Sequence, residues 1–319
     1  MFQLYKKRNF SDFVGDTFAF FKTYGKHYYR NYFIINGGFL LVLLVLMYFL
    51  GKIFYEGFFS NLSGGVNYGA DNSADVFISN NLPLIIGLGL FAFIAAIFLS
   101  ILSYAYPVAY LKLVEKKTDF TTEEIITVIK SKVGKIIVFF LASIFIMFPI
   151  MAIVMGLSFA LVFIIIGIPL LFIIIPALMC WFSLAFYDYI STDKGYFDAL
   201  GGGFSLLKQK FWPCVGSTAV MYMIMQIVVG FVSMIPYIIG IFSMFTTLES
   251  QDGSQVPQPE NISFFMIMMG VTMVLSLLLN FIFQNFILVN QGIMYYSIRE
   301  ENENNTPKSE IDLIGTQSE

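Results

Sequence analysis

The chain has 319 residues, of which 58% are hydrophobic, 18% are aromatic and 12% are charged. This charged fraction is about half that of an ordinary soluble domain, and so few charges cannot cover the apolar surface of a water-soluble protein of this length. The composition excludes a soluble globular protein, a disordered chain and a disulfide-rich secreted module. The net charge of −3 gives no indication of a nucleic-acid partner.

Five stretches contain no lysine, arginine, aspartate or glutamate, and each is longer than the ~18 to 20 apolar residues that cross a bilayer. They have 21, 36, 52, 38 and 38 residues and cover 31–51, 76–111, 136–187, 211–248 and 261–298. The third would extend about 78 Å as one helix, far beyond a hydrocarbon core of about 30 Å, so it must fold back. The sequence therefore predicts six transmembrane helices, at about 33–54, 82–110, 136–157, 164–187, 214–245 and 263–293.

The basic residues separate the two sides of this predicted membrane domain. Of the 18 lysines and arginines, 17 fall before the first span, between the second and third, between the fourth and fifth, or after the sixth. The other side carries Lys52 alone. The positive-inside rule then predicts a multi-pass protein of the bacterial cytoplasmic (inner) membrane with both termini in the cytoplasm.

A similar pattern opens three of the cytoplasmic segments. A residue able to cap a helix is followed by a hydrophobic residue at +6 and a lysine at +10, as in Asp12, Phe18 and Lys22. The same offsets recur at Asp198, Phe204 and Lys208 and, more weakly, at Thr122, Val128 and Lys132. The predicted fold is therefore an all-α polytopic membrane protein, with six transmembrane helices as three hairpins, each preceded by a cytoplasmic amphipathic helix.

Three regions are expected along the chain. Residues 1–32 form a cytoplasmic amphipathic N-terminal helix, 33–298 form the six-helix transmembrane domain, and 299–319 form a disordered cytoplasmic tail. Aromatic and basic residues in the first region are typical of a helix lying on the membrane surface, and the candidates are Phe10, Phe13, Phe18, Phe21 and Lys22. The same aromatic face could instead pack on the protein's own spans, and amphipathicity does not decide between these alternatives.

The segment that leads into the fifth span carries a recognisable motif. It reads Tyr196-Phe-Asp-Ala-Leu-Gly-Gly-Gly-Phe-Ser-Leu-Leu-Lys-Gln-Lys-Phe-Trp212, and its candidate interfacial residues are Asp198, Phe204, Lys208 and Trp212. The motif resembles a cytoplasmic element of the membrane domain of glycerophosphoryl diester phosphodiesterases and of related six-span bacterial integral membrane proteins. This resemblance implies a six-span membrane module. The resemblance does not imply a phosphodiesterase catalytic domain, because the six spans take up most of the chain and leave too few residues for a barrel domain.

Groups that carry chemistry are scarce. No acidic or basic residue lies inside the hydrocarbon core of a predicted span, His27 is the single histidine, and the triplet Gly201–Gly203 lacks the Gly-Lys-Ser/Thr ending of a phosphate loop. The triplet instead indicates a hinge or a site of close packing. We therefore expect no catalytic residue, no metal site and no cofactor.

The sixth span contains a stripe of polar side chains. Ser276, Asn280, Gln284 and Gln291 fall within about 80° of one another on a helical wheel. Such amides favour hydrogen bonds to a neighbouring helix, although the stripe could instead face a wet cavity that admits a polar solute or a lipid headgroup.

Together these features predict a non-enzymatic integral membrane protein that organises lipids or partner proteins at the cytoplasmic membrane. Its expected partners are the lipid bilayer and either another protein or a second copy of the chain, with no nucleic acid. The alternative is a transporter or facilitator of a lipid-like or neutral solute that uses the amide stripe.

Overall fold

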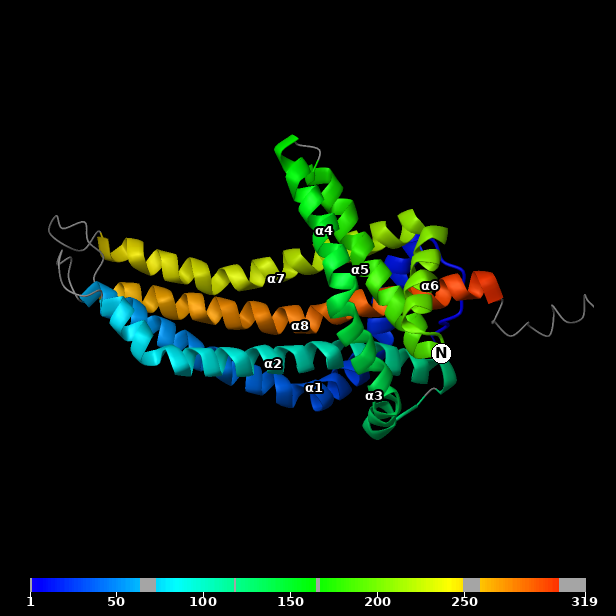
Figure 1. Cartoon of the computed structure of the whole chain (residues 1–319), viewed down its shortest axis with the longest axis horizontal. Helices are drawn as coiled ribbons and strands as arrows, with labels where there is room; N and C mark the ends of the chain where they lie inside the picture. Colours follow the sequence, from blue (N-terminus) through cyan, green and yellow to red (C-terminus); the bar gives the residue numbers. More distant parts are fainter. Residues whose placement is uncertain (1, 64–72, 118, 165–166, 249–258, 304–319) are drawn as a thin grey trace, which may run out of the picture. The chain divides into compact units, whose positions relative to one another are not determined.

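The computed structural model describes residues 2–63, 73–117, 119–164, 167–248 and 259–303 (Figure 1). These residues form eight α-helices and one short 3-10 helix, and no strand occurs among them. The helices are α1 (Phe10–Ser63), α2 (Ser73–Lys116), α3 (Thr122–Phe145), α4 (Met147–Ala160), η1 (Leu161–Ile164), α5 (Gly167–Ser191), α6 (Tyr196–Gln209), α7 (Phe211–Leu248) and α8 (Pro259–Glu303). The all-α prediction is confirmed for this part of the chain.

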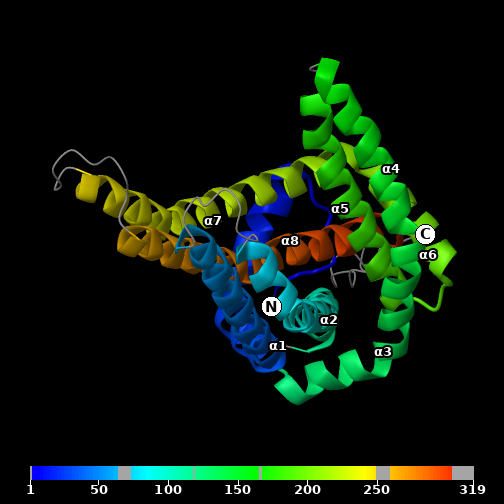
Figure 2. The same cartoon turned by 60° about the vertical axis from the view of Figure 1, so that its left-hand side comes forward.

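Six helical segments of the described chain are long and apolar enough to cross a membrane. They cover Phe10–Tyr55, Ser79–Lys116, Thr122–Ala160, Gly167–Ser191, Phe211–Ser243 and Phe264–Glu303, the third combining α3 with α4. This architecture agrees with the expected multi-pass membrane protein. The apolar stretch 136–187 is divided between α3, α4 and α5, and Figure 2 shows α4 lying along α5.

Four of the helices are longer than a bilayer requires. α1, α2, α7 and α8 have 54, 44, 38 and 45 residues, and at about 1.5 Å per residue even α7 measures about 57 Å. α1 runs without a break through residue 32, the expected end of a separate N-terminal helix, and α8 runs through residue 298 to Glu303. Residues 304–319 of the expected disordered tail lie outside the described residues.

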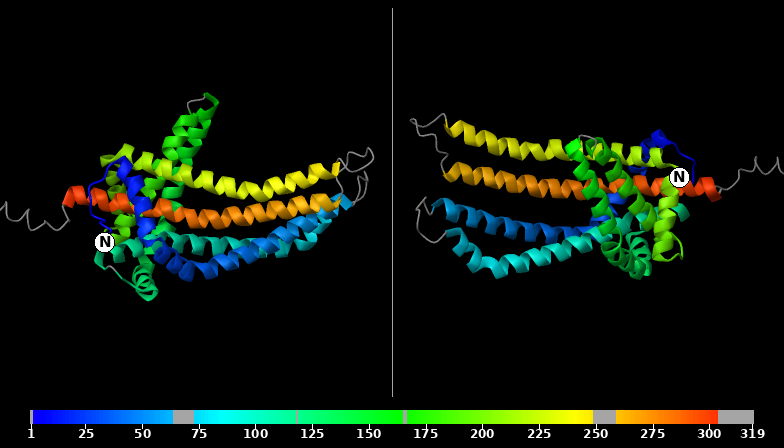
Figure 3. Two further views of the ribbon diagram at one scale, coloured as in Figure 1. Left: turned by 180° about the vertical axis from the view of Figure 1, so that it is seen from behind. Right: turned by 45° about the horizontal axis from the view of Figure 1, so that its top comes forward.

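The chain divides into two compact units. The first, unit 1, contains the residues up to Tyr32, Tyr104–Ile224 and the described residues from Gln284 onward; the second, unit 2, contains Phe33–Ser103 and Met225–Phe283. The borders fall inside α1, α2, α7 and α8, so each of these helices contributes one part to each unit. Both views in Figure 3 show the long helices that are shared in this way.

Aromatic side chains fill much of unit 1. The ring of Tyr28 on α1 lies 4.9 Å from that of Tyr106 and 4.8 Å from that of Tyr110, both on α2 and both edge-on to it. Phe20 and Tyr32 of α1 also contact these α2 rings, and all five side chains are fully buried or nearly so. Edge-to-face pairs of this kind add about 0.5–1.5 kcal/mol each to the burial of apolar area.

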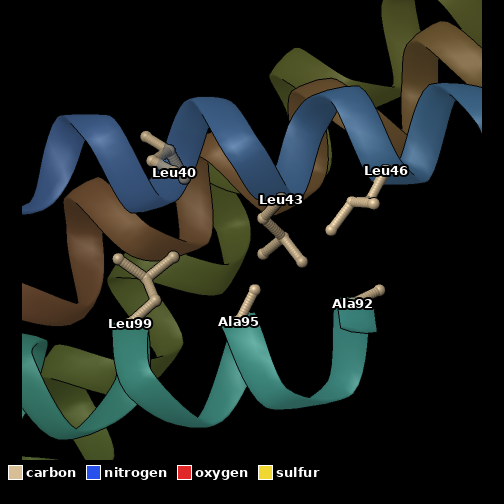
Figure 4. Packing of buried hydrophobic residues seen from close by; sticks show 6 residues of the cluster. All are labelled: Leu40, Leu43, Leu46, Ala92, Ala95 and Leu99. Atoms are coloured by element: carbon tan, nitrogen blue, oxygen red, sulfur yellow. The ribbon is translucent and has the colours of Figure 1, made fainter. Parts of the chain in front are cut away.

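Leucines and alanines pack together in unit 2. Figure 4 shows three leucines of α1 facing two alanines and a leucine of α2, and all six side chains are buried: Leu40, Leu43, Leu46, Ala92, Ala95 and Leu99. Their spacing of three or four residues places each set on one face of its helix. The small alanines allow the leucines to approach α2 closely. Leu277, Leu278 and Phe281 of α8 pack against this cluster.

Candidate functional site

Helix α6 presents one apolar face to its own unit. Ala199, Leu200, Gly203 and Leu207 are buried, and their spacing forms a single helical stripe. A β-carbon on Gly203 would lie 2.5 Å from the backbone nitrogen of Ala185 and 2.6 Å from its α-carbon. The glycine therefore allows the backbones of α5 and α6 to touch, as the close-packing interpretation of the triplet predicts.

The face of α6 beside this stripe carries exposed aromatic side chains. Phe197 and Phe204, seven residues apart, are 70% and 55% exposed, and Lys208 continues the same face and is also exposed. Trp212, at the start of α7, is 68% exposed. We refer to Phe197, Phe204, Lys208 and Trp212 as the α6 surface. Sequence reasoning identified three of these residues and missed Phe197, whose signal was its seven-residue spacing from Phe204.

Two contacts fix the position of the α6 surface. The indole Nε1 of Trp181 on α5 donates a hydrogen bond of 3.0 Å to the carbonyl oxygen of Leu200, and the Trp181 ring lies edge-on to that of Phe204 with 5.9 Å between centroids. Asp198, the remaining residue of the predicted interfacial motif, is exposed in the first turn of α6. A carboxylate there stabilises the helix dipole, so Asp198 has a structural role in the first turn.

The connection between α5 and α6 is held by ion pairs. The Lys194 ammonium lies 2.8 Å from Oδ2 of Asp188, and the Lys135 ammonium lies 3.2 Å from Oδ1 of Asp193. Hydrogen bonding to Lys135 and the charge of that lysine lower the pKa of Asp193 below its ordinary value. These two lysines are therefore engaged with carboxylates of unit 1, whereas Lys208 extends from the exposed face of α6.

The predicted membrane-surface helix is partly turned toward the protein. Phe13 is fully buried, and the ring of Phe21 stacks on that of Phe286 with 4.0 Å between centroids. Phe10 and Phe18 are about two-fifths exposed, at 42% and 41%, and Lys22 is exposed. Packing on the protein's own helices thus accounts for Phe13 and Phe21, and Phe10, Phe18 and Lys22 remain accessible.

Arg8, one of the basic residues of the N-terminal segment, is also buried. Its Nε donates a hydrogen bond of 2.7 Å to Oδ2 of Asp16, and its Nη1 donates to the carbonyl oxygen of Leu4 at 2.6 Å. Burial lowers the pKa of Arg8 from its ordinary value, and the bond to Asp16 opposes this effect. Arg8 therefore orders the segment before α1 and does not contribute a free positive charge to the surface.

A buried polar network joins three helices of unit 1. The Asn290 side chain on α8 donates from Nδ2 to the carbonyl oxygen of Phe13 at 3.0 Å and to Oγ1 of Thr17 at 2.9 Å, both on α1. The hydroxyl of Ser217 on α7 donates to Oδ1 of Asn290 at 3.3 Å. Asn290, Thr17 and Ser217 have no exposed surface, so the network is a packing element without access to a ligand.

The four residues of the predicted amide stripe all lie on α8 but have different surroundings. Ser276 and Asn280 belong to unit 2, whereas Gln284 and Gln291 belong to unit 1. Asn280 is exposed, and its Nδ2 donates to the carbonyl oxygen of Ser276 within α8. Gln291 is buried, and its Nε2 has no hydrogen-bond partner in the part of the chain that the structure describes. The amide that links helices most clearly is Asn290, which sequence reasoning did not single out.

The histidine and the two cysteines take part in contacts within the protein. His27 lies 2.8 Å through Nδ1 from the Tyr110 hydroxyl and 3.1 Å through Nε2 from the Phe120 carbonyl oxygen, so it connects α1 to the segment between α2 and α3. Cys180 and Cys214 are both buried, and neither forms a disulfide. The described residues contain no group of three or more His, Cys, Asp or Glu that could hold a metal ion.

No protein-family model, no curated protein and no solved structure matches this chain.

Proposed function

We propose that this chain is a non-catalytic multi-pass protein of the bacterial cytoplasmic membrane that organises lipids, or proteins bound to them, through the α6 surface. The observation that carries this proposal is the exposure of Phe197, Phe204 and Trp212 beside Lys208 on a helix whose other face is packed against α5. α6 has 14 residues and is about 21 Å long, too short to cross a bilayer. α6 is therefore not itself a membrane span, and its exposed rings are placed by the packing of the helix on α5.

The membrane interface matches the chemistry of these residues. Tryptophan and phenylalanine insert their rings at the level of the headgroups, and a nearby lysine reaches the phosphates of anionic lipids. Each lysine near an anionic surface contributes about 1 kcal/mol to such binding. The asymmetry of the basic residues supports a cytoplasmic position for the α6 surface, because 17 of the 18 fall on its predicted side.

The orientation can be tested with introduced cysteines, since both native cysteines are buried. We expect Asn80→Cys to react with a membrane-impermeant maleimide on intact spheroplasts, and Lys208→Cys to react only after the membrane is opened. Asn80 and Lys208 are both exposed, so accessibility within the fold does not separate them. Labelling of Lys208→Cys on intact spheroplasts would contradict the proposed orientation.

The contact with lipid can be tested by fluorescence, because the chain has only two tryptophans, Trp181 and Trp212. The variant Trp181→Phe leaves Trp212 as the sole emitter. In reconstituted bilayers we expect phospholipids brominated near the glycerol to quench it more strongly than those brominated near the chain ends, because an interfacial ring lies at shallow depth. Acrylamide in the water should quench it weakly.

The matched control is Trp212→Phe, which leaves the partly buried Trp181 bonded to the Leu200 carbonyl. We expect shallow brominated lipid to quench this variant less. Strong quenching of Trp212 by acrylamide without quenching by brominated lipid would show that the α6 surface faces water, and it would contradict the proposal.

A transporter that uses the amide stripe has weaker support. The four polar residues of that stripe are divided between two units, and the side chain of Asn280 bonds to its own helix. The Asn280 amide thus has a hydrogen-bond acceptor within α8 and does not need a bound solute to satisfy it.

A further inference from the structure

Lys132 of α3 lies on the apolar stripe by which that helix packs. Ile129 and Ile136 are buried three residues before it and four residues after it, which is the spacing of one helix face. Lys130, two residues earlier, is exposed on the other side of the helix. Lys132 itself is half-buried, so the chain carries a cation at a position where an apolar side chain would pack.

Lys112 occupies a similar position on α2. Val108 and Ala109, one turn before it, are buried, and Lys112 is half-buried like Lys132. Both lysines line one small hollow of unit 1 between α2, α3 and α5. The other residues that line the hollow are all apolar, among them Phe186 of α5. Two cations therefore meet on an otherwise apolar surface.

The two lysines lack a partner in the part of the chain that the structure describes. Neither Lys112 nor Lys132 forms an ion pair or a side-chain hydrogen bond there. Their charges lie close enough to repel each other, and Lys116, one turn after Lys112, adds to this repulsion. Like charges at a half-buried position are unfavourable, because burial removes part of the water that would screen them.

The two carboxylates that attract Lys112 are bonded to other groups. They belong to Glu115 and Asp193. Glu115 accepts hydrogen bonds from two tyrosine hydroxyls at 3.1 Å and 3.2 Å. Asp193 pairs with the Lys135 ammonium at 3.2 Å. The hollow thus keeps an excess of positive charge, and an anion between the two lysines would offset their repulsion.

The position of the two lysines along their helices matches the level of lipid headgroups. Lys112 is the first charged residue after the charge-free stretch 76–111, and Lys132 lies four residues before the stretch 136–187. Both fall on the predicted cytoplasmic side, where basic pockets between membrane helices bind the phosphates of anionic lipids. The volume of the hollow is about 10 Å³, which is room for about one water molecule, so no acyl chain enters it.

We propose that Lys112 and Lys132 together bind one phosphate group at the cytoplasmic ends of α2 and α3. The phosphate belongs either to the headgroup of an anionic phospholipid or to a soluble anion. Each ammonium donates hydrogen bonds to phosphate oxygens, and the bound anion balances the charge of the pair. This site goes beyond the proposed function and does not depend on the α6 surface, because no residue of α6 lines the hollow.

The test has one arm for each source of phosphate and uses the full chain in detergent. The first arm titrates the protein with phosphatidylglycerol and counts bound lipids by native mass spectrometry. The second arm measures the rise in unfolding temperature when potassium phosphate replaces potassium chloride at equal ionic strength. We expect saturable binding of one phosphate group, weakened about tenfold in Lys112→Gln and in Lys132→Gln, a loss equivalent to about 1.4 kcal/mol. The arm that responds identifies the source.

The matched control is Lys130→Gln, which removes the same charge from α3 outside the hollow and should bind as the native chain does. Lys132→Met completes the apolar stripe, so it should lose binding yet unfold at the native temperature or higher. This result would separate loss of the site from loss of the fold.

Equal weakening in Lys130→Gln and Lys132→Gln, or no response in either arm, would overturn the proposal. Binding seen only after removal of residues 304–319 would assign the two lysines to an acid of this chain and would also overturn it. Quenching of Trp212 should be the same in Lys132→Gln as in the native chain, so failure of this site is separable from failure of the α6 proposal.

Discussion

Replacing Gly203 with leucine is expected to lower the free energy of unfolding by about 3 kcal/mol or to prevent folding altogether. The added side chain would begin 2.5 Å from the Ala185 nitrogen and 2.6 Å from its α-carbon. These are backbone atoms of α5, which cannot rotate away as a flexible side chain can. The helices must separate to admit the leucine, and the buried stripe of α6 then loses its contacts.

The measurement is thermal unfolding in detergent, followed with a dye that fluoresces on reaction with thiols. Cys180 and Cys214 are buried in the native protein, so the dye reports their exposure when unit 1 opens. The matched control is Gly201→Leu, two residues earlier on α6, where a β-carbon meets nothing within 4 Å. We expect this variant to unfold at the native temperature or higher, because leucine favours a helix over glycine. Equal loss in both variants would refute the role of close packing.

The second large effect is expected for Asn290→Leu. Leucine has a similar size but cannot donate to the Phe13 carbonyl and the Thr17 hydroxyl or accept from Ser217. A buried polar group left without a partner costs about 1–3 kcal/mol, so we expect a loss of about 2 kcal/mol. The Thr17 hydroxyl still donates to the Phe13 carbonyl at 2.7 Å, which limits the loss.

The control for this substitution is Asn280→Leu, ten residues earlier on the same helix. Asn280 is exposed and donates to the Ser276 carbonyl of its own helix, so its loss should change the free energy of unfolding by less than about 0.5 kcal/mol. The same thiol-dye assay compares the two variants. A network role for Asn290 would be wrong if the two substitutions shifted the unfolding temperature alike.

Much of the architecture could be predicted because hydrocarbon imposes a simple rule on composition. Charge-free stretches locate the apolar helices, and the need to fold back the stretch 136–187 follows from its length alone. The continuity of α1 through residue 32 could not be predicted in the same way. Polar residues such as Lys26 and Arg30 are as compatible with a helix end as with a helix that continues out of the membrane.

The site was harder to predict than the helices, because a helical wheel does not say what lies opposite each face. Phe13 and Phe204 are both aromatic residues that the sequence predicts at the membrane surface, yet Phe13 is fully buried and Phe204 is 55% exposed. The difference arises from long-range contacts: α8 covers the Phe13 side of α1, whereas only one face of α6 is packed on α5. For the same reason the regular amide stripe suggested a site, and the off-stripe Asn290 did not.

The bonds from Asn290 to Phe13 and from the Arg8 amide to Ser297 also bear on how the chain assembles. The first pair of residues is 277 positions apart and the second pair is 289. During synthesis the beginning of α1 emerges well before its buried polar partners on α8 are made. Unit 1 can therefore reach its final packing only after α8 has been inserted. Until then α1 lies in the membrane without its hydrogen-bond partners on α8. Unit 1 thus assembles late and at a large entropic cost of loop closure. A chaperone or insertase has the most time to bind unit 1 during this interval.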